Sequence, residues 1–439
     1  MKITFLGAGS TVFARNVIGD CMCVDSLKDS TFALYDIDAA RLEESRVILE
    51  AMRRNKGGFG KIECYAGVEN RKEALRGAKF VVNAIQVGGY DPCTIIDFEV
   101  PKKYGLRQTI ADTLGIGGIM RALRTIPVMD DFAKDMAEVC PDALLLNYTN
   151  PMAMLTGYML NHTPIKTVGL CHSVQGCSKG LLRSLGMEDK IEGSHDLIAG
   201  INHMAWLLEI KDKNGNDLYP EIKSRIDDYM NIPDAKDKVR MDYIKNFGYY
   251  VTESSEHNAE YNQFYIKSKY PELIEKFNIP LDEYPRRCVQ QINAWKKEYE
   301  ELKENGVKDH TRTEEYASHI MQSIVENIPY QIGGNVRNTG HLISNFPENA
   351  CVEVPCLVNG RGINPCRVGE LPLVCAAMNM SNIAVQLLTI EAAKTRKKEY
   401  IYQAAMMDPH TSSELDIDTI KKMVDELIDA HGDYLPKYM

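Results

Sequence analysis

The stretch KITFLGAGSTVFAR, residues 2–15, decides the fold. An apolar, strand-like run ends at Gly7, and a helix-like pattern opens directly after Ser10. Gly7 allows a tight turn, and Gly9 lets the backbone approach a pyrophosphate at the N-terminus of the helix. Val12 occupies the third glycine position of the dinucleotide-binding fingerprint, so the match is incomplete. A plain strand-to-helix turn without a ligand is the alternative.

Strand-like and helix-like segments alternate through the first half of the chain. The helical pattern is clearest after the N-cap candidate Asp38. Continuous apolar strands that alternate with helices are typical of a parallel sheet covered on both faces. We therefore expect a Rossmann-type, doubly wound α/β domain with the architecture of lactate and malate dehydrogenases. The expected strands are residues 2–7, 31–36, 61–66, 78–85, 143–149 and 166–171.

The regular alternation of strand-like and helix-like segments ends near residue 195. Extended segments surround an Asn-Gly turn at 214–215, and a polar, mostly helical stretch follows. A strand-and-turn segment rich in Pro and Gly comes next, and helices run to the C-terminus. We predict a nucleotide-binding domain over residues 1–194 and an α+β domain over residues 195–439.

Bulk properties exclude several classes of function. The chain has 439 residues, of which 44% are hydrophobic and 26% charged, with a net charge of -10. Such a charge argues against nucleic acid and anionic membranes as partners. We find no apolar run near the roughly 20 residues of a membrane-spanning helix. The 12 cysteines lie mostly in apolar contexts, which favours reduced thiols and a cytoplasmic protein.

Several polar residues follow the expected strands, where ligands bind in a doubly wound sheet. Asp36 ends the second strand, where its carboxylate can accept hydrogen bonds from adenosine ribose hydroxyls. The same carboxylate would repel a 2′-phosphate, so NAD is favoured over NADP. Asn83 closes the fourth strand, NYTNP (147–151) follows the fifth, and Cys171 and His172 follow the sixth. We expect these groups near the nicotinamide end of the cofactor.

Cys171 and His172 pose a choice between metal binding and strand termination. Neighbouring side chains diverge, so a metal needs a ligand from elsewhere, and AGINHMAW (199–206) offers His203. A thiolate and an imidazole with open positions suit a borderline divalent cation. A single histidine in a strand is more often a core residue, so these residues alone leave the choice open.

The segment YYVTESSEHNAEYNQFYIKSKY (249–270) is rich in acids and tyrosines. One interpretation is a polar surface helix. In the other, Glu256, His257 and Tyr261 supply a base beside a cationic centre, which would lower the pKa of a tyrosine.

These segments together resemble glycoside hydrolase family 4, in the same order and over nearly the whole chain. The motifs that carry the resemblance are G-x-G-S, LYDID, NYTNPM, GLCHSVQG, AGINHMAW, TESSEHNAEY, GNVRNTG and VEVP. The resemblance implies glycoside hydrolysis with NAD and a divalent metal, usually manganese, outside the two-carboxylate mechanism. It implies oxidation at C3, proton removal at C2, elimination, water addition and re-reduction. It also implies a homodimer or homotetramer.

The resemblance assigns roles to residues of this chain. Cys171 and His203 match the metal ligands, and the second domain, residues 195–439, is the one expected to bind metal and substrate. His172 matches the general acid, Tyr261 is taken as the C2 base, and Asn150 matches a substrate-binding asparagine. The residues expected to bind the cofactor are Gly7, Gly9, Ser10, Asp36 and Asn83.

The residues after the cysteine indicate the substrate class. CHSV (171–174) resembles the α-galactosidase subgroup of the family. An α-glucosidase or an α-galacturonidase of the same family is the alternative. A net NAD-dependent dehydrogenase of the lactate/malate type is the alternative from another class, although it would leave the Cys-His pair unexplained.

Overall fold

The strand and turn that decide the fold lie at the centre of the sheet. In this computed structural model, which describes residues 1–306 and 309–439, β1 (Lys2–Leu6) pairs in parallel with β2 and with β4. Gly7 has a φ of 84°, in the left-handed region, and α1 (Thr11–Met22) follows at once. The expected turn between the first strand and helix is therefore confirmed.

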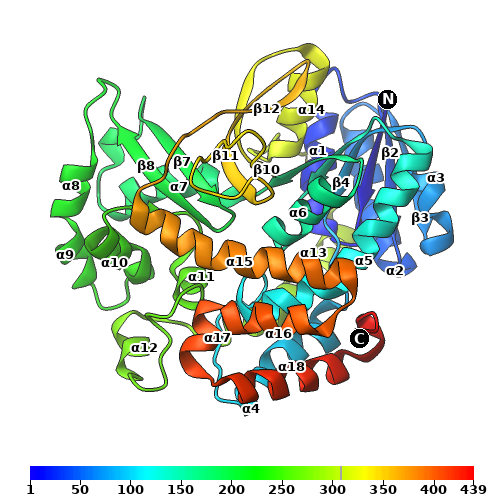
Figure 1. The fold of residues 1–439 in the computed structure, drawn as a ribbon. Coiled ribbons are helices and arrows are strands. Elements are labelled where there is room, and N and C mark those ends of the chain that lie inside the picture. Colours follow the sequence, from blue (N-terminus) through cyan, green and yellow to red (C-terminus); the bar gives the residue numbers. More distant parts are fainter. Residues whose placement is uncertain (307–308) are drawn as a thin grey trace.

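The N-terminal half forms a parallel sheet with the strand order β3-β2-β1-β4-β5-β6 (Figure 1). This is the doubly wound Rossmann order, so the predicted fold class is confirmed. Its further strands are β2 (Thr31–Asp36), β3 (Lys61–Ala66), β4 (Ala78–Asn83), β5 (Leu144–Asn147) and β6 (Lys166–Leu170). Its helices are α2 (Ala39–Asn55), α3 (Arg71–Leu75), α4 (Ile95–Lys103), α5 (Gly115–Val139) and α6 (Met152–His162).

The helix start predicted at Asp38 is also confirmed. The Asp38 carboxylate accepts hydrogen bonds from the backbone N–H groups of Ala40 and Arg41 at 3.0 and 3.1 Å. These bonds satisfy donors that have no partner within the helix, which is why aspartate is favoured at this position.

The sheet continues beyond β6 with antiparallel strands in the order β10-β11-β7-β8-β9. Two strands from late in the sequence thus lie between β6 and β7. The strands are β7 (His195–Ile201), β8 (Met204–Lys211), β9 (Tyr250–Val251), β10 (Tyr330–Arg337) and β11 (Cys351–Asn359), with β12 (Gly362–Pro365) paired to β11. One sheet therefore runs through both predicted domains, whose proposed boundary falls just before β7.

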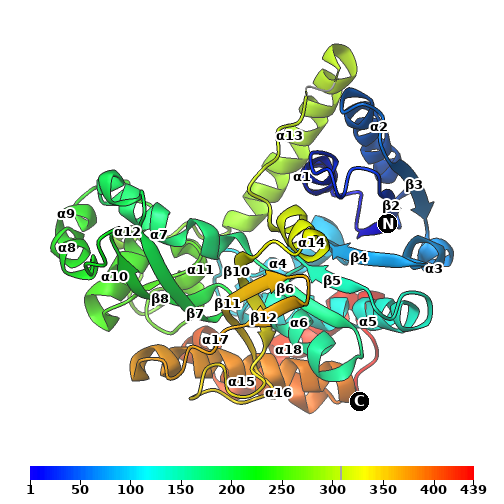
Figure 2. The same ribbon diagram turned by 90° about the horizontal axis from the view of Figure 1, so that it is seen from above.

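Strands β7 to β9 and the neighbouring short helices form a lobe with its own small core (Figure 2). Its helices are α7 (His172–Ser184), α8 (Tyr219–Ser224), α9 (Ile226–Met230), α10 (Lys238–Phe247), α11 (Ser255–Glu260) and α12 (Glu272–Lys276). The long helix α13 (Glu283–Asn305) instead lies beside α1 and α2. There Arg15 pairs with Glu298 at 2.5 Å, and Trp295 donates to Glu44 at 3.0 Å.

The C-terminal helices pack together against α4, α5 and α6 (Figure 1). Among the described residues one of them is long and apolar enough to cross a membrane, which the sequence inspection did not find. It is α15 (Leu373–Thr395), with a mean hydropathy of 1.6 over a window that is 50% buried. A buried core helix meets the same criteria, and α15 packs on α5, α6 and α16. The remaining helices are α14 (Tyr316–Glu326), α16 (Lys398–Met407), α17 (Pro409–Glu414) and α18 (Ile417–His431).

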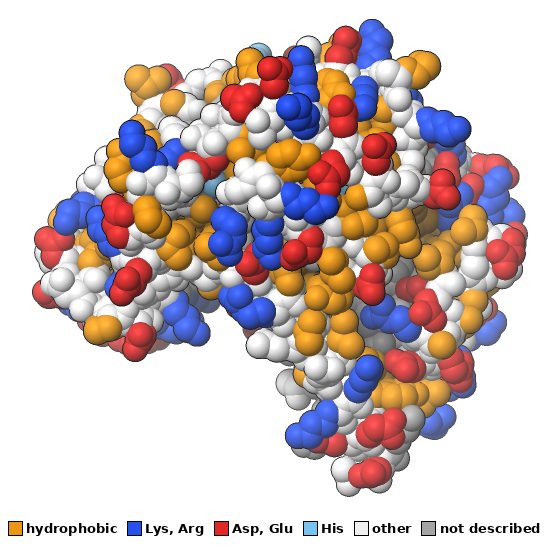
Figure 3. All heavy atoms as spheres, turned by 90° about the horizontal axis from the view of Figure 1, so that it is seen from below, with side chains coloured by type: hydrophobic (Ala, Val, Ile, Leu, Met, Phe, Trp, Pro, Cys, Tyr) orange, Lys and Arg blue, Asp and Glu red, His pale blue; other side chains and the backbone are white. Residues whose placement is uncertain are grey.

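Charged side chains of both signs are intermingled on the face drawn in Figure 3. Interspersed charges produce no single-signed field, which is the feature that draws polyanions to a surface.

Candidate functional site

A cavity of about 410 Å³ lies beyond the carboxyl ends of the parallel strands. Residues that follow β1, β4, β5 and β6 contribute to its wall, as expected for a doubly wound sheet. The lobe formed by β7 to β9 closes the opposite side. Six of the residues named from the sequence lie in this wall: Ser10, Asn150, Cys171, His172, His203 and His257.

The turn between β1 and α1 leaves the start of the helix free. Ser10 is the N-cap residue of α1, yet its side chain makes no capping hydrogen bond. Gly9 donates its N–H to Asp36 Oδ2 at 2.6 Å, and a Cβ atom on Gly9 would lie 2.7 Å from that oxygen. A larger residue therefore cannot replace Gly9 without a shift. The start of α1 thus lies close to the Asp36 carboxylate, the arrangement that suits a dinucleotide.

Asn83 is not among the residues that line this cavity. Its side chain is fully buried, and its Nδ2 donates to Asn147 Oδ1 at 2.9 Å and to Thr149 Oγ1 at 3.2 Å. Asn83 thus holds the loop after β5, and that loop carries Asn150 into the wall. The Oδ1 atom of Asn150 is buried without a protein partner, so it is available to a ligand.

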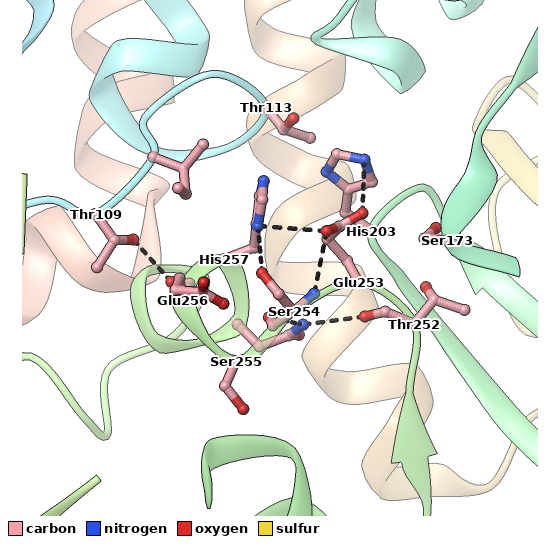
Figure 4. Close-up of polar contacts among 12 residues, drawn as sticks. Thr109, Thr113, Ser173, His203, Thr252, Glu253, Ser254, Ser255, Glu256 and His257 are labelled. Carbon is pink, nitrogen blue, oxygen red and sulfur yellow. Dashed lines mark hydrogen bonds and ion pairs between the residues drawn. The ribbon is translucent and has the colours of Figure 1, made fainter. Parts of the chain in front are cut away.

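Two groups of three side chains, which share His203, converge where a metal ion could bind. Ligand atoms of Cys171, His203 and Glu253 lie within 4.8 Å of one another, as do those of Asp112, His203 and His257. Figure 4 shows His203, Glu253 and His257 pointing toward one another. The sequence reasoning named Cys171 and His203, but it missed Glu253 and Asp112.

Two of these residues have unusual backbone conformations. His203, at the tip of the β7–β8 hairpin, has a φ of 62°, and Glu253, directly after β9, has a φ of 65°. Residues other than glycine adopt such angles at a cost, and they concentrate at functional sites. The hairpin thus directs His203 toward Cys171 at the end of β6.

Electrostatics show that the cluster favours positive charge at its centre. Burial by itself would lower the pKa of His203, but Cys171 and the Glu253 carboxylate raise it to about 10. Burial would raise the pKa of Glu253, yet His203 and His257 lower it to about 2. A thiolate, an imidazole and a carboxylate are a suitable donor set for a divalent cation.

The His172 imidazole stands at the edge of the cavity. His172 is the first residue of α7, and its Nε2 lies 2.6 Å from Glu315 Oε2. The hydrogen bond with Glu315 raises the pKa of His172, although partial burial opposes it. A histidine held protonated by a carboxylate is suited to act as a general acid.

The structure separates Tyr261 from the cavity and places Tyr284 in its wall. Tyr261 is completely buried, and its hydroxyl lies 3.3 Å from His203 Nδ1. That contact leaves Nε2 of His203 free to face Glu253. Tyr284 lines the cavity, and its hydroxyl accepts a hydrogen bond from Arg121 at 3.4 Å. Tyr284 lies in LDEYPRR, outside every motif that the sequence reasoning singled out.

A buried carboxylate holds the loop that presents Asp112. Glu260 accepts hydrogen bonds from the backbone N–H groups of Thr109 and Ala111 at 2.7 and 2.8 Å. Ala111 has a φ of 53°, so this backbone is strained and needs such support. Burial raises the pKa of Glu260 to about 7, against the effect of those donors. Glu260 therefore connects the segment 249–270 to the cavity by positioning Asp112.

Family models match both halves of the chain. A model described as family 4 glycosyl hydrolase matches residues 2–187, and one described as the C-terminal domain of that family matches residues 198–411. The chain belongs to family 4 of the glycosyl hydrolases, and the family resemblance seen in the motifs is confirmed.

Individual relatives cover the chain from end to end. An α-galactosidase of Bacillus subtilis (strain 168) is 58% identical, covering 100% of this chain and 99% of that protein. An α-galactosidase of Rhizobium meliloti (strain 1021) is 33% identical, with coverages of 100% and 89%. The solved structure of a 6-phospho-α-glucosidase from gut microorganisms, in complex with NAD and Mn²⁺, has a TM-score of 0.80. That protein is 18% identical, with coverages of 100% and 99%, and shows the shared fold.

Proposed function

We propose that the protein is an NAD- and divalent-metal-dependent α-galactosidase of family 4. One observation carries the proposal: a free helix N-terminus after β1 and a Cys171–His203–Glu253 group lie on the same cavity. The 58% identity to the Bacillus α-galactosidase over the full chain supports the substrate class.

NAD fits the turn between β1 and α1. Gly7, Gly9 and Ser10 would hold the pyrophosphate, and Asp36 would accept hydrogen bonds from the ribose hydroxyls. The Asp36 carboxylate already accepts N–H groups from Gly9 and Asp38, which fix its orientation. Its negative charge would disfavour a 2′-phosphate, so NAD is preferred over NADP.

Manganese or another divalent cation would be held by Cys171 and His203, with Glu253 as a third donor. When bound, NAD would supply a hydride acceptor for C3 of the sugar, and the metal would supply positive charge to the C2 and C3 oxygens, so that the C2 proton becomes acidic. The protein itself supplies the acid and the base.

The general acid we propose is His172, because Glu315 holds its imidazole at the cavity edge in a position to donate a proton. We assign the C2 base to Tyr284 in place of Tyr261. Of these two tyrosines only Tyr284 lines the cavity. Burial raises the pKa of Tyr284, and the neighbouring Arg121 guanidinium opposes that rise by favouring the phenolate. Asn150, with its unpaired Oδ1, would accept a hydrogen bond from a sugar hydroxyl.

An α-galacturonidase is the second candidate function, and Arg121 is the observation that favours it. Arg121 is 8% exposed, lines the cavity, and donates a hydrogen bond to Tyr284. A guanidinium in such a place could bind the carboxylate of a uronic acid. The carboxylates of Asp112 and Glu253 lie in the same wall and would repel the carboxylate of a uronic acid, so the neutral galactoside is preferred.

The test is incubation of the protein with p-nitrophenyl α-galactoside, NAD, Mn²⁺ and a reductant. The proposal expects release of p-nitrophenol without net formation of NADH. Cleavage of the corresponding α-galacturonide alone would select the second candidate. Stoichiometric NADH would instead select a net dehydrogenase.

Location and assembly belong to the same proposal. All 12 cysteines are free thiols, which supports the proposed cytoplasmic location. A homodimer or homotetramer is expected from the family resemblance, and size-exclusion chromatography with light scattering would test it.

A further inference from the structure

A second cavity adjoins the one in which we place the reaction. Its volume is about 770 Å³, and it lies between α7, the start of β10 and the segment before α14. His172 lines both cavities. Its side chain is 59% exposed and is held by Glu315, so its imidazole stands at the boundary between the two spaces.

The position of the general acid relates these two spaces to the two parts of a substrate. A general acid must touch the glycosidic oxygen, the atom that joins the reacting sugar to its leaving group. The reacting sugar lies beside Cys171 and His203 in the proposed function. We propose that the second cavity binds the leaving group, and that this leaving group is an uncharged sugar.

The wall of the second cavity has the chemistry that suits a sugar. Gln175, Lys179 and Arg183 follow one another along α7, and the Tyr330 ring lies at the start of β10. Besides His172, whose proton passes to the leaving group, the charged groups of this wall are these two cations and the carboxylates of Asp196 and Glu314, so their formal charges cancel. Amides and charged groups bind hydroxyls, and aromatic rings pack on the apolar faces of sugars. A phosphorylated or acidic leaving group would need an excess of cations.

This inference rests on the proposed function, and a comparison of two galactosides tests it. One is α-galactosyl-(1→6)-glucose, and the other is methyl α-galactoside, whose methanol is too small to fill the second cavity. Both leaving groups would be strongly basic as alkoxides, so both need the proton of His172 and depart as alcohols. Only binding of the leaving group distinguishes them.

The variants are Gln175→Ala and Tyr330→Ala, with Gln291→Ala as the matched control on the exposed surface of α13. Each cavity variant is expected to raise KM for the disaccharide by about 5- to 10-fold, the effect of one or two lost hydrogen bonds or packing contacts. KM for methyl α-galactoside should stay unchanged, as should both values in Gln291→Ala. Because Tyr330 also stacks on His319, Gln175→Ala is the variant less prone to misfold.

The two possible failures are distinguishable. Equal changes in KM for both galactosides, or no change for either, would overturn the leaving-group cavity and keep the proposed function. A wild-type protein that cleaves neither galactoside would overturn the proposed function and this inference with it.

A separate observation concerns the strands between the two proposed metal ligands. Cys171 follows β6 and His203 follows β7, and the sheet places β10 and β11 between them. On these two strands Asn335 Nδ2 donates to Glu353 Oε1 at 2.8 Å. The two residues are 0% and 1% exposed. They belong to the motifs GNVRNTG and VEVP, to which the proposed reaction assigns no role.

The register places this hydrogen bond directly behind the metal ligands. Asn335 lies opposite Gly169, two residues before Cys171, and Glu353 lies opposite Gly200, three residues before His203. Asn202 is also completely buried, and its amide, Asn335 Oδ1 and Glu353 Oε2 have no partner among the described residues. Burying polar groups without partners costs free energy of folding, and apolar residues at these positions would avoid that cost. Their presence therefore indicates a function other than stability.

We infer that Asn335 and Glu353 are positioning residues that set the distance between Cys171 and His203. The hydrogen bond ties β10 to β11, and these strands fix the separation of β6 and β7. Residues behind the ligands of a metal site commonly alter its affinity because they orient those ligands.

The test measures Mn²⁺ binding directly by titration calorimetry and by electron paramagnetic resonance. Asn335→Ala and Glu353→Gln should weaken Mn²⁺ binding by about 10- to 100-fold while the circular dichroism spectrum stays native. Asn338→Ala is the matched control: Asn338 is equally buried and also makes side-chain hydrogen bonds, but to the loop 343–347. It should lower Tm and leave Mn²⁺ affinity unchanged. Wild-type Mn²⁺ affinity in both test variants would overturn the inference.

Discussion

Replacement of Glu315 by glutamine tests whether the carboxylate keeps His172 protonated. Glutamine has nearly the same shape, and its amide oxygen can still accept the hydrogen bond from the Tyr316 N–H that begins α14. The variant therefore removes the negative charge 2.6 Å from the imidazole and changes little else. We expect the pKa of His172 to fall.

The size of the shift follows from the exposure of the pair. A pair in solvent contributes about 0.2–1 kcal/mol, and the 59% exposure of His172 keeps this one near that range although Glu315 is buried. Because one pKa unit corresponds to about 1.4 kcal/mol, this range corresponds to a fall of about 0.1–0.7 unit. Glu314→Gln removes the neighbouring charge without touching the imidazole and is the control.

The assay is a proton NMR titration of the protein with labelled histidine, read at His172. The pKa of His172 is raised in the folded protein, so the pair stabilises the fold below the unfolded pKa. This stabilisation is lost as the pH rises through the folded pKa. Glu315→Gln should therefore lower Tm more at pH 6 than at pH 9. An unchanged His172 pKa, or a Tm loss independent of pH, would refute the reasoning.

Three further predictions concern other parts of the site. Asp36→Ala should weaken NAD binding by about 1–3 kcal/mol, or about 5- to 150-fold, and relax discrimination against NADP. Fluorescence titration measures both affinities, and an unchanged NAD affinity would remove Asp36 from the cofactor site. Cys171→Ser should lose Mn²⁺ and activity, whereas His172→Ala should keep Mn²⁺ and cleave aryl galactosides better than alkyl ones. Elemental analysis that finds no Mn²⁺ in His172→Ala would make His172 a metal ligand. Tyr284→Phe should abolish exchange of the C2 proton by NMR, whereas Tyr261→Phe should keep it, and the reverse result would restore Tyr261 as the base.

Local patterns in the sequence were sufficient for the parallel half of the fold. Each predicted strand contains the observed one, because continuous apolar runs between helices leave little choice of element. Asp38 was predictable because capping depends on residues within one turn. The insertion of β10 and β11 between β6 and β7 was not predictable, since pairing between strands so distant in sequence leaves no local signal.

The residues of the site likewise fall into those that the sequence predicted and those that only the structure shows. Cys171 and His203 were found through motifs, and the structure brings them together. Glu253 reaches the cluster because its backbone has a positive φ, which no composition or spacing reveals for a glutamate. Tyr284 enters the wall through the course of the chain before α13, and Tyr261, in the more conspicuous motif, is turned inward beside His203. Tertiary structure, which sequence spacing does not contain, is the basis on which we propose Tyr284 in place of Tyr261.

The central claim is that the glycosidic bond breaks after proton removal at C2 and not by direct displacement. The most direct measurement is hydrolysis of methyl α-galactoside in D₂O with catalytic NAD and Mn²⁺, followed by NMR of the galactose released. The account predicts deuterium at C2 of the product and no net NADH. Galactose that carries only protium at C2 would contradict it.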